Sequence, residues 1–458
     1  MLAGNFTESK RYKLPDDKFI GANREDGFSV AGSFSRMREF YTSVAVAFVV
    51  RVAAALAAFL LTLVIARTLG PEQSGYYFLA FSIVAILAAL SRLGLDSTLV
   101  RFIGADNTQA TSAVKKALVM AGAASLVSSV GLFALAEPLA LHLFQKAELA
   151  SVLRSISVGV TGLALLTLAG NALQGLGRVV PSILVTGVIL NFSLIAALLL
   201  VQSVTADSLA RMFALFSIAT AFVGFLVFLR PHLGAKQSEI EYREILESCL
   251  PLLFVVVMQQ LVQWSGLFIA GVYLQPESVS LLACAQRTAM LVSFVLVAVN
   301  LVVAPRFASL YRQGAMAELE KLALTSVKLV TALALPVILV MVVFPDTVML
   351  LFGPEFVDGG PLLRILAVGQ FLNAICGSVG ILLIMSGNEK DVRNVVLISG
   401  TFALSSVWVL TAFYGESGNA IGTAAAIAGQ NLMTVFLVRK RLGFNTLAVW
   451  RSVKSEQV

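Results

Sequence analysis

Long apolar runs separated by short polar connections fill the chain between about residues 44 and 438. A membrane-spanning helix needs about 20 mainly apolar residues, and the runs reach that length about twelve times. The predicted spans lie near 44–66, 76–95, 114–135, 155–175, 180–201, 211–230, 249–273, 279–303, 324–345, 361–385, 393–414 and 419–438. The pattern therefore predicts an all-α integral membrane protein with about twelve transmembrane helices.

Composition favours a membrane protein over a soluble one. Apolar residues make up 58% of the 458 positions and charged residues 13%, whereas a soluble domain carries about 25% charged residues. The net charge of +7 does not predict nucleic-acid binding, because the basic residues lie between apolar spans and not on one exposed face. Cys249, Cys284 and Cys376 lack the spacing of a disulfide framework or a metal site.

The distribution of Lys and Arg predicts the orientation of the spans, because cytoplasmic loops carry the excess of these residues. When the N-terminus is placed in the cytoplasm, most of the 33 Lys and Arg residues fall on that side. The opposite side holds Arg67, Lys146, Arg154, Arg211 and Arg364. We therefore expect both termini in the cytoplasm. Residues 1–42, which are polar, mixed in charge and unlike a signal peptide, are expected to form a cytoplasmic tail.

Short matches recur in the same order at a nearly constant offset, which indicates an internal repeat of six spans. The matched pairs are Pro71-Glu72 with Pro276-Glu277, Arg101-Phe102 with Arg306-Phe307, Leu153-Arg154 with Leu363-Arg364, Val158-Gly159 with Val368-Gly369, and Gly177 with Gly387. Six is even, so both halves share one orientation and form a parallel repeat. The expected organisation is an N-terminal tail 1–42, a six-helix bundle 43–230, a cytoplasmic linker 231–248, a second bundle 249–440 and a cytoplasmic tail 441–458.

Several motifs resemble those of the polysaccharide and oligosaccharide flippases, which share a superfamily with the MATE multidrug exporters and the lipid II flippases. In the first half the motifs are Ala66-Arg67-Thr68-Leu69-Gly70-Pro71-Glu72, Gly75-Tyr76-Tyr77, Leu93-Gly94-Leu95-Asp96-Ser97 and Arg101-Phe102. In the second half they are Ala285-Gln286-Arg287-Thr288-Ala289, Ala298-Val299-Asn300, Ala304-Pro305-Arg306-Phe307, Leu310-Tyr311, Leu351-Phe352-Gly353-Pro354-Glu355-Phe356 and Ser386-Gly387-Asn388. The resemblance covers about residues 44–442.

This resemblance implies a MATE-like fold and a flippase of the bacterial inner membrane. Such proteins move isoprenoid-pyrophosphate-linked sugars from the cytoplasmic to the periplasmic leaflet. The implied partners are the lipid-linked anionic glycan, membrane lipid and the polysaccharide assembly machinery, and no cofactor is implied. The chain departs from the pattern of relatives that carry an acidic residue midway through the seventh span, because it has Gln263-Trp264-Ser265-Gly266 there.

Three arginines, Arg51, Arg92 and Arg287, lie inside predicted spans, and no Asp or Glu lies in the middle of one. An ionisable side chain in a span costs about 2.5–3.5 kcal/mol on insertion scales, so it indicates function first. Guanidinium pairs bidentately with phosphate oxygens, and we therefore predict that these arginines bind the pyrophosphate. The structural alternatives are an i,i+4 pair of Arg92 with Asp96 and extension of Arg51 to the membrane interface.

Polar residues in the seventh span are a second candidate for substrate binding. Gln259 and Gln263 share one helix face at i,i+4 spacing, which would suit sugar hydroxyls, and Trp264 could supply a stacking surface. The alternative is hydrogen bonding between helices, which such residues commonly provide in membrane bundles.

Two other functions compete with a flippase. A MATE-type multidrug exporter is disfavoured, because cationic drugs favour a carboxylate and no span carries one near its middle. A glycan polymerase or ligase is disfavoured, because the outer loops are short and the chain shows no nucleophile–base pair, metal cluster or phosphate-binding glycine loop. We therefore expect a transporter that is not an enzyme, without catalytic or metal-binding residues.

Overall fold

The computed structural model describes residues 30–201, 203–229 and 239–447. The contacts divide the chain into two units between Ala45 and Val46, and the side chains described below lie after that division. Most of the predicted tail 1–42 and parts of the predicted linker 231–248 and tail 441–458 lie outside the described residues.

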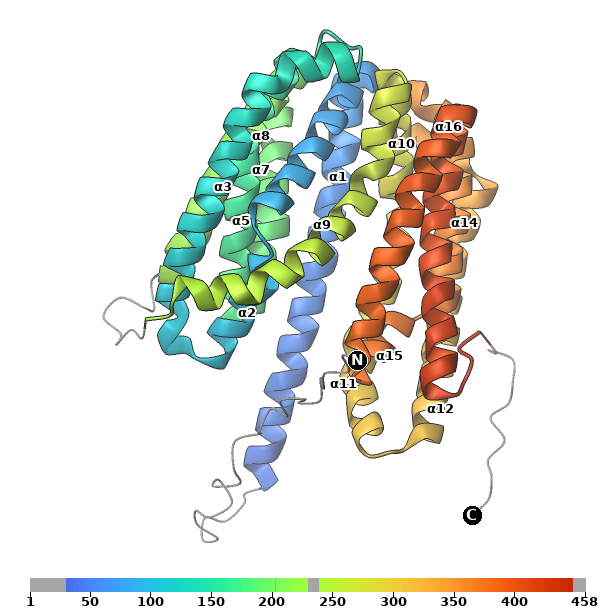
Figure 1. The fold of residues 1–458 in the computed structure, drawn as a ribbon. Helices are drawn as coiled ribbons and strands as arrows, with labels where there is room; N and C mark the ends of the chain where they lie inside the picture. The colour runs from blue at the N-terminus through green and yellow to red at the C-terminus, as the bar shows by residue number, and fades with distance from the viewer. Residues whose placement is uncertain (1–29, 202, 230–238, 448–458) are drawn as a thin grey trace, which may run out of the picture. The chain divides into compact units, whose positions relative to one another are not determined.

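The described chain consists of helices and short connections, with no β-strand in these ranges (Figure 1). The long helices are α1 (Val30–Ser91), α3 (Ala110–Pro138), α5 (Val158–Gly175), α8 (Ala206–Leu229), α9 (Tyr242–Tyr273), α11 (Ser293–Arg312), α12 (Met316–Val343), α14 (Gly360–Cys376) and α16 (Glu389–Leu442). The shorter ones are α2 (Leu95–Ala105), α4 (Leu149–Ile156), α6 (Val179–Ile183), α7 (Leu190–Leu200), α10 (Pro276–Ala289), α13 (Pro345–Met349) and α15 (Val379–Met385). Brief 3₁₀ or π segments join several of these, namely η1 (Asn107–Gln109), η2 (Leu139–Leu143), η3 (Leu184–Ile189), η5 (Met290–Val292), η6 (Leu350–Phe352) and η7 (Pro354–Gly359).

Ten helical stretches among the described residues are long and apolar enough to cross a membrane. Two of them contain 46 and 54 residues, about twice the length that a crossing needs. Each of these two is interrupted by a glycine with non-helical backbone angles, Gly70 in α1 and Gly415 in α16. Each therefore supplies two crossings, which confirms the predicted all-α membrane fold of about twelve transmembrane helices.

The break in α1 follows directly from its sequence. Gly70 has a φ of 71°, a left-handed conformation that glycine adopts without steric cost. Pro71 follows, and it favours the start of a helix because its fixed φ suits the first turn and its missing N–H needs no partner there. The Gly70-Pro71 pair thus ends one membrane helix and begins the next.

Small residues let neighbouring helices approach closely within each half of the chain. A Cβ atom on Gly162 of α5 would lie 2.0 Å from Oγ of Ser217 on α8. In the second half, a Cβ atom on Gly369 of α14 would lie 2.7 Å from the Cβ of Ala424 on α16. Such close contacts are typical of membrane bundles, where packing replaces the hydrophobic effect between helices.

Large apolar side chains cover much of the outward-facing surface. Leu200, Phe254 and Phe413 are 83%, 74% and 79% exposed. Exposed apolar side chains of this size and number are unfavourable in water and favourable in lipid. The chain is therefore a multi-pass membrane protein.

Helix α9 connects helices from the two halves (Figure 1). Its start lies beside α2, where a Cβ atom on Gly94 would be 2.4 Å from the carbonyl oxygen of Cys249. Lys116 of α3 donates a hydrogen bond to the carbonyl of Ile240, just before α9 begins. The end of α9 packs on α10 and α16. The domain boundaries at residues 230 and 249 stay a prediction.

Candidate functional site

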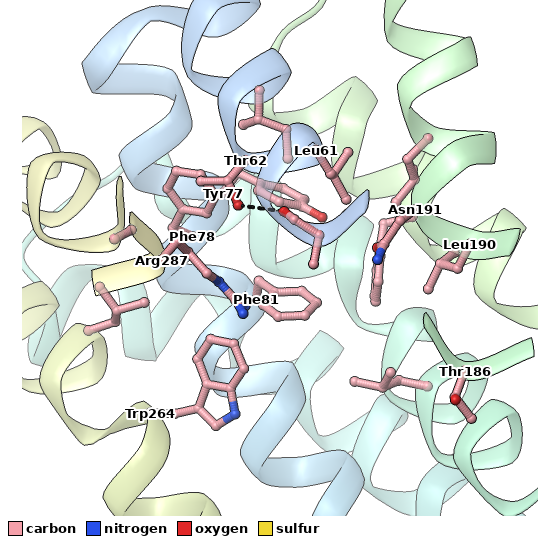
Figure 2. A pocket seen from close by; sticks show the side chains of 17 residues that line it. Leu61, Thr62, Tyr77, Phe78, Phe81, Thr186, Leu190, Asn191, Trp264 and Arg287 are labelled. Carbon is pink, nitrogen blue, oxygen red and sulfur yellow. Dashed lines mark hydrogen bonds between the residues drawn. The ribbon is translucent and has the colours of Figure 1, made fainter. Parts of the chain in front are cut away.

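A cavity of about 150 Å³ lies where helices of both halves meet (Figure 2). Its first wall comes from the first half and is lined by Ala58, Leu61, Thr62, Ile65, Tyr77, Phe78, Phe81, Leu163, Thr186, Leu190, Asn191, Leu194 and Phe213. Its second wall comes from the second half and is lined by Trp264 and Leu267 of α9 with Ala283 and Arg287 of α10. We call this space the central cavity.

Arg287 is the charged residue of the central cavity, and it is held by an aromatic side chain. Its guanidinium carbon lies 5.3 Å from the centroid of the Trp264 ring, a distance at which a cation is attracted to the ring face. Trp264 in turn packs edge-on against Phe81, with ring centroids 5.2 Å apart. Among the described residues, no carboxylate or carbonyl forms an ion pair or hydrogen bond with Arg287. Its five N–H donors are therefore available to an anion.

The local fold explains where Arg287 stands. It lies in the last turn of α10, immediately before the 3₁₀ segment η5. A 3₁₀ segment inside a longer helical run often marks a functional hinge. The span predicted at 279–303 is thus divided into α10, η5 and α11, and the cation stands beside the division.

Arg92 differs from Arg287 in its contacts, because it is paired with a carboxylate. Its side chain is 6% exposed, and its Nε lies 2.8 Å from Oδ1 of Asp96. Asn171 donates a further hydrogen bond of 2.9 Å to the same oxygen. The residues between them include Leu93 and Gly94, both with positive φ, so the pair bridges the turn between α1 and α2. Arg92 thus forms the i,i+4 pair with Asp96 that the sequence offered as the structural alternative.

The other predicted residues lie apart from the central cavity. Arg51 of α1 and Gln259 of α9 are exposed. Gln263 lines a second cavity of about 150 Å³ within the second half, together with Gln286 and Gln370. Neighbouring residues of α9 thus face different cavities, Gln263 the second one and Trp264 the central one. Of the six residues predicted to bind substrate, the structure brings Arg287 and Trp264 together.

Sequence reasoning missed the polar side chains of the first wall, Thr62, Tyr77, Thr186 and Asn191. None of them is charged, and uncharged polar side chains commonly form hydrogen bonds between membrane helices, so they indicate function less strongly than an arginine does. An amide in the apolar run 180–201 was a usable signal for Asn191, because unpartnered amides are rare in lipid.

Within the described ranges, no group of three His, Cys, Asp or Glu side chains could hold a metal ion.

Repeat-related segments of the two halves close one end of the cavity, the end predicted to face the periplasm. The hydroxyl oxygens of Ser74 and Ser280 lie 2.6 Å apart, and both are buried. A Cβ atom on Gly75 would lie 1.9 Å from the carbonyl oxygen of Pro276, so only glycine fits there. The starts of the second and eighth predicted spans are therefore in direct backbone contact.

Two cations strengthen the same end by donating hydrogen bonds across the halves. Arg67 donates to the carbonyl of Leu351 at 2.7 Å. Lys146 donates to the carbonyl of Gly271 at 2.8 Å. Burial lowers the pKa of Lys146, and the nearby charge of Glu277 opposes that shift. We call these contacts, with Ser74–Ser280 and Gly75–Pro276, the end closure.

Comparison with solved structures identifies the class of membrane protein that has this fold. An inward-facing MATE-family multidrug resistance transporter of the MOP superfamily matches with a TM-score of 0.68 at 18% identity, over 90% of this chain and 100% of the other. The lipid II flippase MurJ in an inward closed conformation matches with a TM-score of 0.69 at 15% identity, over 85% and 87%. A MOP-superfamily transporter from Pyrococcus furiosus, with a binding pocket described as reversed in polarity, matches with a TM-score of 0.63 at 17% identity, over 89% and 96%. At these identities the likeness establishes a MATE-like fold.

The sequence itself identifies the family. A family model described as polysaccharide biosynthesis protein matches residues 64–361, and the chain belongs to that family. A comparison with curated proteins finds no match. The family and the fold together confirm the resemblance inferred from the motifs.

Proposed function

We propose that the protein flips an isoprenoid-pyrophosphate-linked oligosaccharide across the bacterial inner membrane. The observation that carries this proposal is Arg287, a cation that lies over the Trp264 ring in the cavity shared by both halves and has no carboxylate partner among the described residues. A phosphate oxygen suits such a group, because guanidinium binds it with short, charge-assisted hydrogen bonds. Membership of a polysaccharide biosynthesis family supports a glycan as the cargo.

Transport would proceed by alternating access of the central cavity. The end closure would separate while the opposite end closes, so that the headgroup passes between the halves and the isoprenoid remains in lipid. In this proposal both termini lie in the cytoplasm, and the polysaccharide assembly machinery receives the cargo on the periplasmic side. The charge at residues 67 and 146 would then face the periplasm.

Multidrug export is the competing function, because MATE transporters share the fold. The 17 residues that line the central cavity include no Asp or Glu. A cationic drug would therefore meet a like charge at Arg287 and find no carboxylate in this cavity, which favours an anionic cargo. Drug-efflux assays with cationic dyes distinguish the two functions.

The deciding experiment locates the lipid-linked glycan in a strain that lacks the protein. We expect accumulation in the cytoplasmic leaflet, relieved by the wild-type protein. Arg287→Ala should reduce translocation roughly tenfold or more, because a hydrogen bond to a charged group contributes about 1.5–3 kcal/mol. Arg243→Ala, which changes an exposed arginine outside the cavity that pairs with Glu247, is the control and should leave translocation unchanged. Normal translocation in the deletion strain, or in an Arg287→Ala strain with equal protein in the membrane, contradicts the proposal.

A further inference from the structure

The hydrogen-bonding groups of the central cavity are divided between its two walls (Figure 2). The second wall has two polar groups, the guanidinium of Arg287 and the indole of Trp264. Both are donors without an acceptor atom. This wall therefore favours ligand groups that accept hydrogen bonds, such as phosphate oxygens.

The first wall mainly presents acceptors. Thr62 donates its hydroxyl hydrogen to the carbonyl of Ala58 at 3.0 Å, and Thr186 donates its own to the carbonyl of Ser182 at 2.8 Å. Since each hydroxyl hydrogen is used within its own helix, the oxygen lone pairs remain for a ligand.

Asn191 also offers an acceptor. Its amide nitrogen uses one of its two N–H groups to donate to the carbonyl of Gly187 at 2.8 Å, and its amide oxygen has no partner among the described residues. Tyr77, whose hydroxyl both donates and accepts, completes the polar groups of this wall. The first wall therefore favours ligand groups that donate hydrogen bonds, such as sugar hydroxyls.

A π segment places two of these acceptors on the cavity wall. Thr186 and Asn191 are five positions apart, and five residues of an α-helix turn through about 140° beyond one full turn. The π segment η3 between α6 and α7 is wound more widely, so positions five apart come closer to one face. Single π turns inside α-helices are frequent at functional sites. The π segment thus helps to bring both side chains to the wall of the cavity.

We infer that the central cavity binds a sugar phosphate in a fixed orientation. The phosphate contacts Arg287, and hydroxyls of the first sugar donate to Asn191 and Thr186, which act as specificity residues. The inference rests on the proposed function and adds which part of the glycan is recognised. A cavity of about 150 Å³ is smaller than the pockets of about 300–1,000 Å³ that hold drug-sized ligands, so contact is limited to the sugar next to the phosphate.

The test uses the purified full chain and the fluorescence of Trp264. Trp408→Phe and Trp450→Phe leave Trp264 as the remaining tryptophan of the three in the sequence. The probes are inorganic phosphate, glucose 1-phosphate, galactose 1-phosphate and N-acetylglucosamine 1-phosphate. We expect at least one sugar phosphate to bind about three- to tenfold more tightly than inorganic phosphate, which corresponds to one or two net hydrogen bonds.

Asn191→Leu should remove that gain and leave the affinity for inorganic phosphate unchanged. The matched control is Asn431→Leu, because Asn431 makes the same bond to the fourth preceding carbonyl, that of Ile427, and does not line the cavity. Thr186→Val, with Thr167→Val as its control, is the second test of the same wall.

The outcomes separate this inference from the proposed function. If phosphate binds but no sugar phosphate binds more tightly, or if Asn191→Leu and Thr186→Val both keep the gain, the inference is wrong and the phosphate site remains. If neither phosphate nor any sugar phosphate changes the fluorescence of Trp264, the cavity is not a phosphate site and both ideas fail.

Discussion

Two arginines inside the apolar part of this chain differ in what surrounds them. Arg92 is paired with Asp96, which also accepts a hydrogen bond from Asn171, whereas Arg287 lies over an aromatic ring and has no carboxylate partner in the part of the chain that the structure describes. A buried charge with a partner stabilises a fold or specifies its geometry, while a charge without one is costly unless a ligand binds it. Residue type and depth in the membrane therefore identify both arginines as unusual, and their neighbours distinguish the paired Arg92 from Arg287.

The contrast predicts that Arg92→Gln lowers stability, since it leaves Asp96 as a largely buried carboxylate without its cation. We expect a loss of about 1–3 kcal/mol, measured as a lower unfolding temperature in detergent. Arg92→Gln with Asp96→Asn should recover most of the loss, because neither charge then remains. A double variant as unstable as the single one would show that Arg92 stabilises the protein through other contacts.

The residues of the candidate site could be predicted from the sequence where a charge lies inside a span, but not where the rotation of a helix decides which cavity a side chain faces. Arg287 and Trp264 were identified because cations and amphipathic aromatics are unusual in a span. Gln259 and Gln263 share a helix face with spacing i,i+4, but that spacing leaves the direction of the face open. The packing of α9 on α10 and α16 turns Gln263 toward a second cavity.

At the scale of elements, the apolar runs of the sequence predict the membrane helices but not the irregular turns inside them. Length and hydropathy predict α3, α8 and α12 because each is one uninterrupted run. The π segment η3 and the break at Gly377 between α14 and α15 have no comparable signal, since neither changes the hydropathy of its run. These interruptions depend on contacts between helices, which a pattern along one helix does not contain.

The break in α1 gives a prediction at this scale. Gly70→Ala should destabilise the protein by about 1–2 kcal/mol, because an L side chain is strained at a φ of 71°. Space is not the cause, since the nearest atom to the added Cβ, Oε2 of Glu355, would be 3.6 Å away. Gly122→Ala in α3 is the control, because it lies in regular helix with no atom within 4 Å of an added Cβ. Equal unfolding temperatures of the two variants would contradict the strain at Gly70.

For the molecule as a whole, the end closure joins segments that the internal repeat relates. Pro71-Glu72 and Pro276-Glu277 begin equivalent helices, and these helices meet at Ser74, Gly75 and Ser280. The contacts are hydrogen bonds and close backbone packing rather than ion pairs. Each hydrogen bond contributes about 0.5–1.5 kcal/mol net, so the closure can separate and re-form at moderate cost.

A disulfide across this closure tests whether it opens during transport. Ser74→Cys with Ser280→Cys places two sulfur atoms where hydroxyl oxygens lie 2.6 Å apart, close to the geometry of a disulfide. Cys249, Cys284 and Cys376, which are free thiols, are replaced beforehand to prevent other pairings. If the closure must open in each cycle, oxidation stops glycan translocation and reduction restores it, while each single-cysteine variant is unaffected by oxidant. Translocation at the wild-type rate by the fully cross-linked protein would show that the cargo crosses without separation of this end, and alternating access between the halves would then be the wrong mechanism.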